Sequence, residues 1–224
     1  MQLSKRLNYL THLPVLKAMC KTFSPTGILE LGCGKHSTSF FYNYDGDIVS
    51  LENDEKWCES IRKICPDKDN FKLIFHDVGD GITKRTKHNE LSEEKINNIN
   101  NFYDDILSRY NLNFLFVDHW KSIRCRSIRY LSHKFDIIAY HDAEDKNKQY
   151  YYRTLISEPL DGFFHWIYCS FTTQTGILIN KKYSDKLEIF DKNIEYYHEE
   201  FCKSIGKKCK CKIKRIKNEK NNIT

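Results

Sequence analysis

The sequence predicts an α/β fold with a doubly wound, mostly parallel sheet. Short apolar runs of strand length alternate with longer segments whose apolar residues recur at helical spacing, and this alternation is typical of βαβ units. The runs are apolar nearly throughout, as expected of parallel strands buried on both faces. The five strand candidates are GILEL (27–31), DIVSLE (47–52), FKLIFHD (71–77), NFLFVD (113–118) and FDIIAYHD (135–142).

The segments between these runs predict helices. WCESIRKI (57–64) places Trp57, Ile61 and Ile64 on one helical face, and Asn53 or Asp54 stands at its start as a cap. A polar insertion at about 80–110 separates the third and fourth strands, and its later part, EEKINNINNFYDDILSRY, has helical spacing. Each strand thus connects to the next through a helix.

The second half of the chain predicts an antiparallel end to the sheet. After a helical KNKQYYYRTLIS come two strand candidates, HWIYCSFT (165–172) and TGILINKKY (175–183), joined by a short polar connection. LEIFDKNIEYYHEEFCKSI (187–205) then predicts a final amphipathic helix. We therefore expect a single domain over 1–205, which includes the 80–110 insertion, and a tail over 206–224.

Composition favours a cytoplasmic protein without a membrane partner. The chain has 224 residues, 40% of them hydrophobic, and no apolar run of membrane-spanning length. Its first residues are interrupted by His12 and Pro14, unlike a secretion signal. The nine cysteines are scattered and form no CxxC pair, so we expect reduced thiols rather than a zinc site or disulfides.

The positive charge is concentrated in the tail. Residues 201–224 hold nine lysines and arginines against one acid, so the rest of the chain is nearly neutral. A basic tail of this kind binds nucleic acid or is simply solvated, and we favour the solvated state.

A glycine turn and a series of acids follow the first strands. LELGCGKHSTSFF (29–41) places Gly32 and Gly34 where a first strand meets its helix, so the backbone can approach a ligand there. The dinucleotide fingerprint GxGxxG is absent, because Ser37 stands at its third glycine. Glu52 and Asp77 lie at or near the ends of the next two strands, where acids can meet a ribose and an adenine.

These motifs resemble those of a known family. ILELGCG, LEND, FHD and LFVDH, over about residues 10–183, look like motif I and its sequels in class I S-adenosylmethionine-dependent methyltransferases. The resemblance implies a Rossmann-like sheet of seven strands with the last one antiparallel. GCGKHSTSFF is close to the GxGxST-like turn of some branches, with His36 where many members carry a third glycine.

The resemblance also implies a binding site for S-adenosyl-L-methionine. Glu30, Gly32 and Gly34 would shape the methionine end and Glu52 would hold the ribose. Asp77 with Val78 would meet the adenine. The complete set of expected cofactor-binding residues is Glu30, Gly32, Cys33, Gly34, His36, Ser37, Glu52, Asn53, Asp77, Val78 and Asp118.

The later strands resemble those of sugar and small-molecule O-methyltransferases. In FLFVDHWKSIRCRSIRYLSHKFDIIAYHDAED, strands end in VD plus His and in HD, which implies catalytic roles for Asp118, His119 and Asp142. Two mechanisms stay open. Either a divalent ion such as Mg²⁺ is held by Asp118 and Asp142, completed by Glu144 or Asp145, or a histidine acts as general base, with His119 favoured over His141.

The acceptor is expected to be a small hydroxyl compound or a glycan. Arg124 is the arginine that we expect to meet an anionic group on it. Two other functions remain: methylation of RNA or a nucleotide cap through the basic tail, and a non-catalytic binding subunit that kept the cofactor fold. No oligomeric state is predicted.

Overall fold

The computed structural model describes residues 10–77, 90–144, 153–170, 173–207 and 212–216. They form two compact units. The described part of Pro25–Ile138 is called the parallel unit, and the described residues before 25 and after 138 are called the antiparallel unit. No helix in these ranges is both long and apolar enough to cross a membrane.

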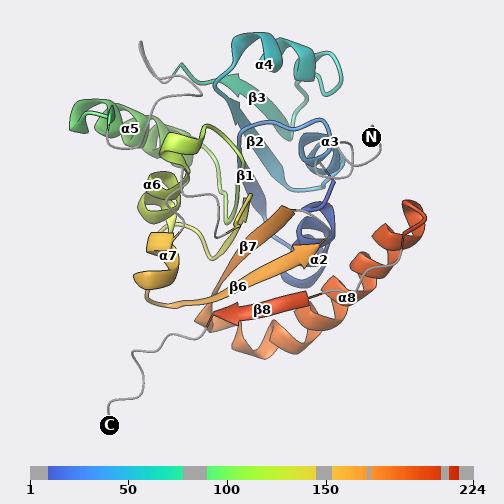
Figure 1. Ribbon diagram of the computed structural model, residues 1–224. Coiled ribbons are helices and arrows are strands. Elements are labelled where there is room, and N and C mark those ends of the chain that lie inside the picture. The colour runs from blue at the N-terminus through green and yellow to red at the C-terminus, as the bar shows by residue number, and fades with distance from the viewer. Residues whose placement is uncertain (1–9, 78–89, 145–152, 171–172, 208–211, 217–224) are drawn as a thin grey trace. The chain divides into compact units, whose positions relative to one another are not determined.

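The parallel unit alternates strands and helices as predicted. Its strands lie in the order β3-β2-β1-β4 and are all parallel (Figure 1). The boundary between the two units falls within β5 (Ile137–His141). The elements are β1 (Gly27–Leu31), α3 (Ser37–Tyr42), β2 (Asp47–Glu52), α4 (Glu55–Arg62), β3 (Phe71–Phe75), α5 (Glu93–Arg109), β4 (Phe114–Val117) and α6 (Lys121–Leu131).

An apolar core packs against the strands of the parallel unit. Every residue of β1 and of β4 is buried, and Phe41 of α3 packs its ring 6.0 Å from Phe114 and 5.9 Å from Phe116. Because parallel crossovers are right-handed, this strand order places α3 and α4 on one face of the sheet and α5 on the other. Because β1, β2 and β4 run parallel to one another, their carboxyl ends lie at the same edge of the sheet.

Side-chain caps start two of these helices. Asp54 accepts a hydrogen bond from the backbone N of Trp57 at 3.1 Å, and Ser92 accepts one from the backbone N of Lys95 at 3.3 Å. The predicted apolar face of the segment 57–64 is only partly present. Ile61 is buried, but α4 ends at Arg62, and Ile64 beyond it is 49% exposed.

The antiparallel unit contains the predicted strand pair. Strand β6 pairs antiparallel with β7, and this confirms the late antiparallel strand of the predicted α/β class. The elements are α2 (Leu13–Phe23), α7 (Arg153–Ser157), β6 (Phe163–Ser170), β7 (Thr173–Asn180), the 3₁₀ helix η3 (Lys181–Lys186), α8 (Leu187–Ser204) and β8 (Lys212–Ile216).

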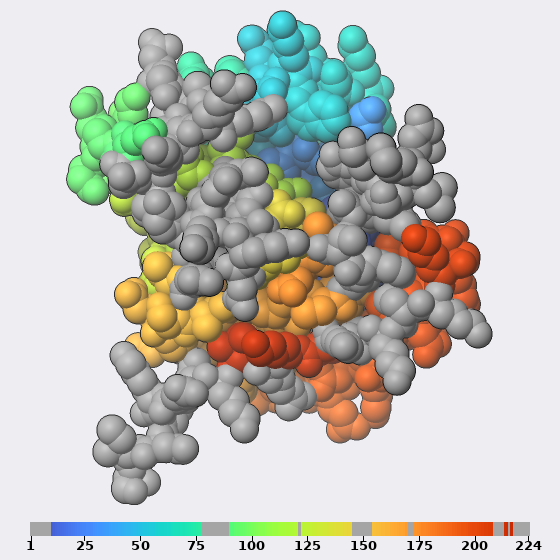
Figure 2. All heavy atoms as spheres, viewed as in Figure 1, coloured from blue at the N-terminus to red at the C-terminus, as the bar shows by residue number. Residues whose placement is uncertain are grey.

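The described residues contain eight strands rather than the seven expected. The eighth, β8, lies within the segment predicted as a basic tail and pairs antiparallel with the second edge of β6. Figure 2 shows its atoms, in red, at the surface. The segment thus forms a strand by backbone pairing with the open edge of β6, although it is rich in basic residues. Lysines are common on strands at the edge of a sheet.

Helix α2 has no counterpart among the predicted elements. Proline fits the first turn of a helix, where its missing N–H is not needed, and Pro14 stands there. The helix packs on α8: the rings of Phe23 and Phe190 lie 5.7 Å apart, and Nδ2 of Asn193 donates to Oγ1 of Thr22 at 2.9 Å.

Candidate functional site

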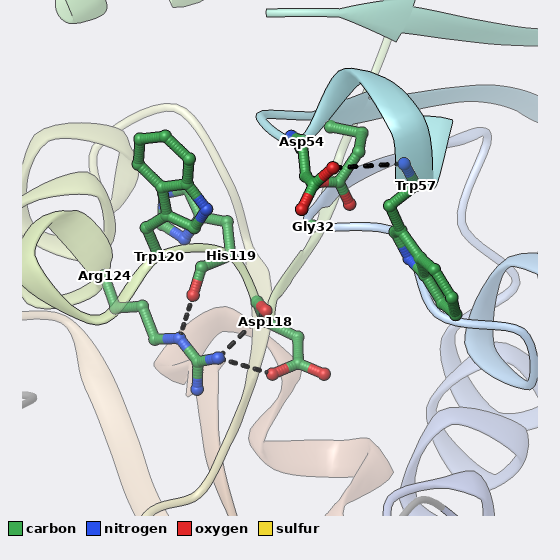
Figure 3. A pocket seen from close by; sticks show the side chains of 8 residues that line it. Gly32, Asp54, Trp57, Asp118, His119, Trp120 and Arg124 are labelled. Atoms are coloured by element: carbon green, nitrogen blue, oxygen red, sulfur yellow. Dashed lines mark hydrogen bonds and ion pairs between the residues drawn. The ribbon is translucent and has the colours of Figure 1, made fainter. Parts of the chain in front are cut away.

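A cavity of about 250 Å³ lies at the carboxyl edge of the parallel unit. It contains five residues predicted for the site, Gly32, Glu52, Asp118, His119 and Arg124. The other lining residues are Asp54, Trp57 and Trp120. Figure 3 shows the two indoles on opposite sides of the cavity, with the carboxylate of Asp118 between them.

Gly32 allows two turns to meet at the floor of this cavity. Its φ of +89° belongs to the left-handed region, and its N–H donates to the carbonyl of Leu51 at 2.8 Å. A Cβ at this position would lie 2.4 Å from the backbone N of His119. The turn after β1 therefore rests directly on the backbone of the turn after β4, and only glycine fits there.

Glu30 lies beneath the turn rather than in the cavity lining. Its carboxylate is fully buried, and one oxygen accepts from Oγ of Ser50 at 2.6 Å and from Oγ1 of Thr38 at 2.9 Å. Thr38 in turn accepts from the backbone N of Gly34 at 3.0 Å. Glu30 thus holds the glycine turn through Thr38. Burial raises its pKa to about 7, and the charge of Asp118 acts in the same direction.

Replacing Glu30 by glutamine should change how stability depends on pH. A carboxyl group whose pKa is higher in the folded state than in the unfolded state stabilises fully below about 4.5, and this stabilisation is lost as the pH rises through about 7. From pH 4.5 to 8 the wild type should lose about 3 kcal/mol relative to Glu30→Gln. Urea unfolding of both proteins at the two pH values measures this, and parallel pH profiles would contradict it.

Glu52 organises the end of β2 through three backbone N–H groups. One carboxylate oxygen accepts from Cys33 at 3.0 Å, and the other accepts from Asn53 at 2.7 Å and from Asp54 at 2.8 Å. The side chain is 6% exposed and lines the cavity. Burial raises its pKa, and the three N–H groups oppose that rise. The carboxylate therefore joins the glycine turn to the next strand end.

Trp57 and Asp54 are cavity residues that the sequence reasoning missed. The sequence predicts Trp57 only on a helical face and Asp54 only as a cap, and Asp54 does cap α4. The indole N–H of Trp57 also donates to the carbonyl of Cys33 at 2.7 Å, which fixes the ring beside the glycine turn. One signal in the sequence could have identified Trp57 as a cavity residue. It lies in the first turn of α4, which follows β2, and β2 ends in the acid Glu52.

Arg124 is engaged within the site rather than presented to an anionic acceptor. Its guanidinium donates to a carboxylate oxygen of Asp118 at 2.7 Å and to the carbonyl of the same residue at 2.9 Å (Figure 3). It also donates to the carbonyl of His119. Arg124 therefore hydrogen-bonds to the turn that follows β4.

His119 directs one edge of its ring toward two helices. Its Nε2 lies 3.3 Å from the hydroxyl of Tyr103 on α5 and 3.1 Å from that of Ser127 on α6. Burial lowers its pKa well below the usual value, and the charges of Arg124 and His76 add to this. The imidazole is therefore neutral at physiological pH. Its Nδ1 is buried and has no partner among the described residues.

The other residues predicted to bind the cofactor differ in their burial and position. Cys33, Ser37 and Asn53 are buried, and Nδ2 of Asn53 donates to the carbonyl of His76 at 3.2 Å. His36 and Asp77 are exposed and do not line the cavity. Val78 lies outside the described residues.

The predicted residues after β5 belong to the antiparallel unit. Asp142 has a φ of +59°, and its carboxylate lies 3.6 Å from Nδ1 of His141. Glu144 accepts from the backbone N of Gln174 at 3.0 Å, and Asp145 lies outside the described residues. A joint role of Asp118 and Asp142, with or without a divalent ion, stays a prediction.

Comparisons with known proteins identify similar structures but no sequence relatives. No family model and no curated protein sequence matches the chain. A methyltransferase from Geobacter sulfurreducens is 13% identical over 75% of this chain and 78% of its own, with a TM-score of 0.47. A methyltransferase-like protein from Silicibacter pomeroyi is also 13% identical, over 80% of this chain and 93% of its own, with a TM-score of 0.46. A dimethyladenosine transferase from Plasmodium falciparum is 13% identical over 76% of this chain and 62% of its own, with a TM-score of 0.40.

Proposed function

We propose that the chain is an S-adenosylmethionine-dependent methyltransferase. The observation that supports this most is the cavity at the carboxyl edge of β1, β2 and β4, where Gly32, Glu52 and Asp118 meet. Ligands of open α/β sheets bind at this edge. Three of the four strand ends that the resemblance assigns to the cofactor, those of β1, β2 and β4, contribute to the cavity lining, whereas Asp77 after β3 does not line it.

The residues present fit this cofactor in hydrogen-bonding capacity. Gly32 lines the cavity without adding a side chain to it, because the backbone of the turn after β4 occupies the position that a Cβ would take. Nε1 of Trp120 and Nδ1 of His119, two residues of the cavity lining, are buried polar atoms without a partner among the described residues. Buried polar atoms of this kind are normally satisfied, and a bound ligand or water would satisfy them. Gly32 and Glu52, both in the lining, would hold the cofactor.

Charge in the cavity suits a cationic ligand. Its lining has three carboxylates, Glu52, Asp54 and Asp118, against one guanidinium, Arg124, which is bound to Asp118. The bound cofactor supplies an electrophilic methyl group on a positively charged sulfonium, and the carboxylates attract this charge in a partly buried setting. An anionic acceptor would be repelled by the same groups.

The finer proposal is O-methylation of an uncharged sugar or other small hydroxyl compound. The flat indoles of Trp57 and Trp120 on opposite sides of the cavity suit a ring-shaped acceptor (Figure 3). Asp118 is the group that we assign to orient the acceptor hydroxyl by accepting its hydrogen bond. Nε2 of His119 is less suited to this task, because Tyr103 and Ser127 already contact it.

Calorimetric titration with S-adenosylmethionine and S-adenosylhomocysteine tests the proposal. We expect one site per chain and about tenfold weaker binding of S-adenosylmethionine by Asp118→Asn, because one carboxylate facing the cation is lost. Asp105→Asn is the matched control, since Asp105 pairs with Arg109 on the exposed side of α5. Absence of binding to both compounds would refute the proposal. Binding without methyl transfer to any hydroxyl acceptor would favour the non-catalytic alternative.

A further inference from the structure

We propose that Arg124 is the positioning residue of this site: it fixes the turn between β4 and α6 so that the carboxylate of Asp118 keeps its aim toward the cavity. This inference rests on the proposed function for the role of Asp118. It assigns Arg124 an internal partner in place of the anionic substrate group that the sequence suggested.

Three hydrogen bonds tie the guanidinium to two consecutive residues. Nε of Arg124 donates to the carbonyl of His119, while one terminal nitrogen donates to the carbonyl and to the carboxylate of Asp118. The arginine side chain is 7% exposed and that of Asp118 is 24% exposed. Charge-assisted hydrogen bonds are stronger than neutral ones, and burial limits competition from water. The second carboxylate oxygen of Asp118 points away from Arg124 in Figure 3.

The start of α6 explains why this turn needs such a restraint. Trp120 occupies the capping position of α6, and its side chain makes no capping hydrogen bond. The usual side-chain cap, which fixes how the chain enters a helix, is therefore missing at this point. Arg124, in the first turns of the same helix, reaches back and holds the two carbonyls that precede it.

The restraint also reaches the glycine turn. The backbone of Asp118 and His119 lies against Gly32, where an added Cβ would be 2.4 Å from the N of His119. A shift of the turn after β4 would therefore change both the aim of Asp118 and the floor of the cavity. An arginine suits this task, because its planar guanidinium donates in several fixed directions at once, whereas a lysine ammonium is a single point of charge.

Binding of S-adenosylmethionine by Arg124→Met and Arg124→Lys tests this assignment. We expect both variants to bind about 10- to 100-fold more weakly than the wild type, because neither can hold both carbonyls and the carboxylate. Arg126→Met is the matched control on the same helix, since Arg126 is partly exposed and lies 3.7 Å from Glu93 at the surface. It should bind within about twofold of the wild type. Circular dichroism and thermal unfolding of each variant establish that it is folded.

A rescue measurement separates positioning from a general effect on folding. Guanidinium chloride at low, non-denaturing concentration should restore part of the affinity of Arg124→Ala, whereas sodium chloride at equal ionic strength should not.

Three results would overturn the assignment: wild-type affinity in Arg124→Met, full recovery in Arg124→Lys, or an Arg124→Ala variant that guanidinium does not restore. If the wild type binds neither cofactor compound, the proposed function fails, and hydrogen exchange then tests the restraint alone. In that case exchange of the backbone amides of 118–120 should be faster in Arg124→Met than in Arg126→Met. Equal exchange in the two variants would refute the restraint as well.

Discussion

Replacing Gly32 by alanine should lower the free energy of unfolding by about 3 kcal/mol and the melting temperature by about 10 °C. Two costs combine at this position. An L-residue is strained at a φ of +89°, and the added Cβ would lie 2.4 Å from the backbone N of His119 and 2.6 Å from the backbone C of Asp118. Backbone atoms cannot turn aside as a flexible side chain can, so the two turns must separate. Thermal and urea unfolding measure the loss.

Gly162→Ala is the matched control for this prediction. Gly162 also has a positive φ, +81°, but nothing lies within 4 Å of a Cβ built there. Its substitution should therefore cost only the conformational strain, about 1 kcal/mol. Equal losses at the two glycines would show that contact between the turns contributes nothing. Gly32→Ala should in addition weaken cofactor binding, and Gly162→Ala should leave it unchanged.

Replacing Glu52 by alanine should weaken binding of S-adenosylhomocysteine roughly 100-fold and lower stability by about 2 kcal/mol. The carboxylate accepts from the backbone N–H groups of Cys33, Asn53 and Asp54, so its removal leaves three donors without their acceptor at the cavity wall. The cavity also loses an acidic group that the resemblance to class I methyltransferases assigns to the ribose. Calorimetric titration and urea unfolding measure the two effects.

Glu59→Ala serves as the control, because Glu59 is exposed on α4 and does not line the cavity. It should change affinity by less than twofold and stability by less than about 0.5 kcal/mol. A Glu52→Ala variant that loses stability but binds normally would assign Glu52 to the architecture of the turn alone. Such a result would count against the ribose contact.

The strand framework was predictable because its signal is local. The apolar runs at 27–31 and 47–52 coincide with β1 and β2, since strands buried on both faces must be apolar throughout. The helix predicted within 93–110 is α5, whose buried residues, such as Ile99 and Ile106, recur at helical spacing. The spacing of apolar residues indicated whether each segment is a helix or a strand. Once the strands were located, Gly32, Glu52 and Asp118 could be placed at or just after their ends.

Elements that depend on a distant partner were not predictable in the same way. Strand β8 consists largely of basic residues, and it exists because β6 offers an open edge for backbone pairing. Helix α2 is stabilised by its contacts with α8, although the two lie far apart in the sequence. Neither the run of lysines nor Pro14 carries information about those partners.

By itself the sequence determined the α/β class and the strand ends that carry the glycine turn and the acids. Only the tertiary structure decided how each polar side chain is used. Arg124 holds Asp118 instead of facing a substrate, Glu30 lies beneath the turn, and Trp57 forms a wall of the cavity. The reason is physical: periodicity sets the face on which a side chain lies, but its hydrogen-bond partner and its burial depend on residues that the fold brings from other strands and helices.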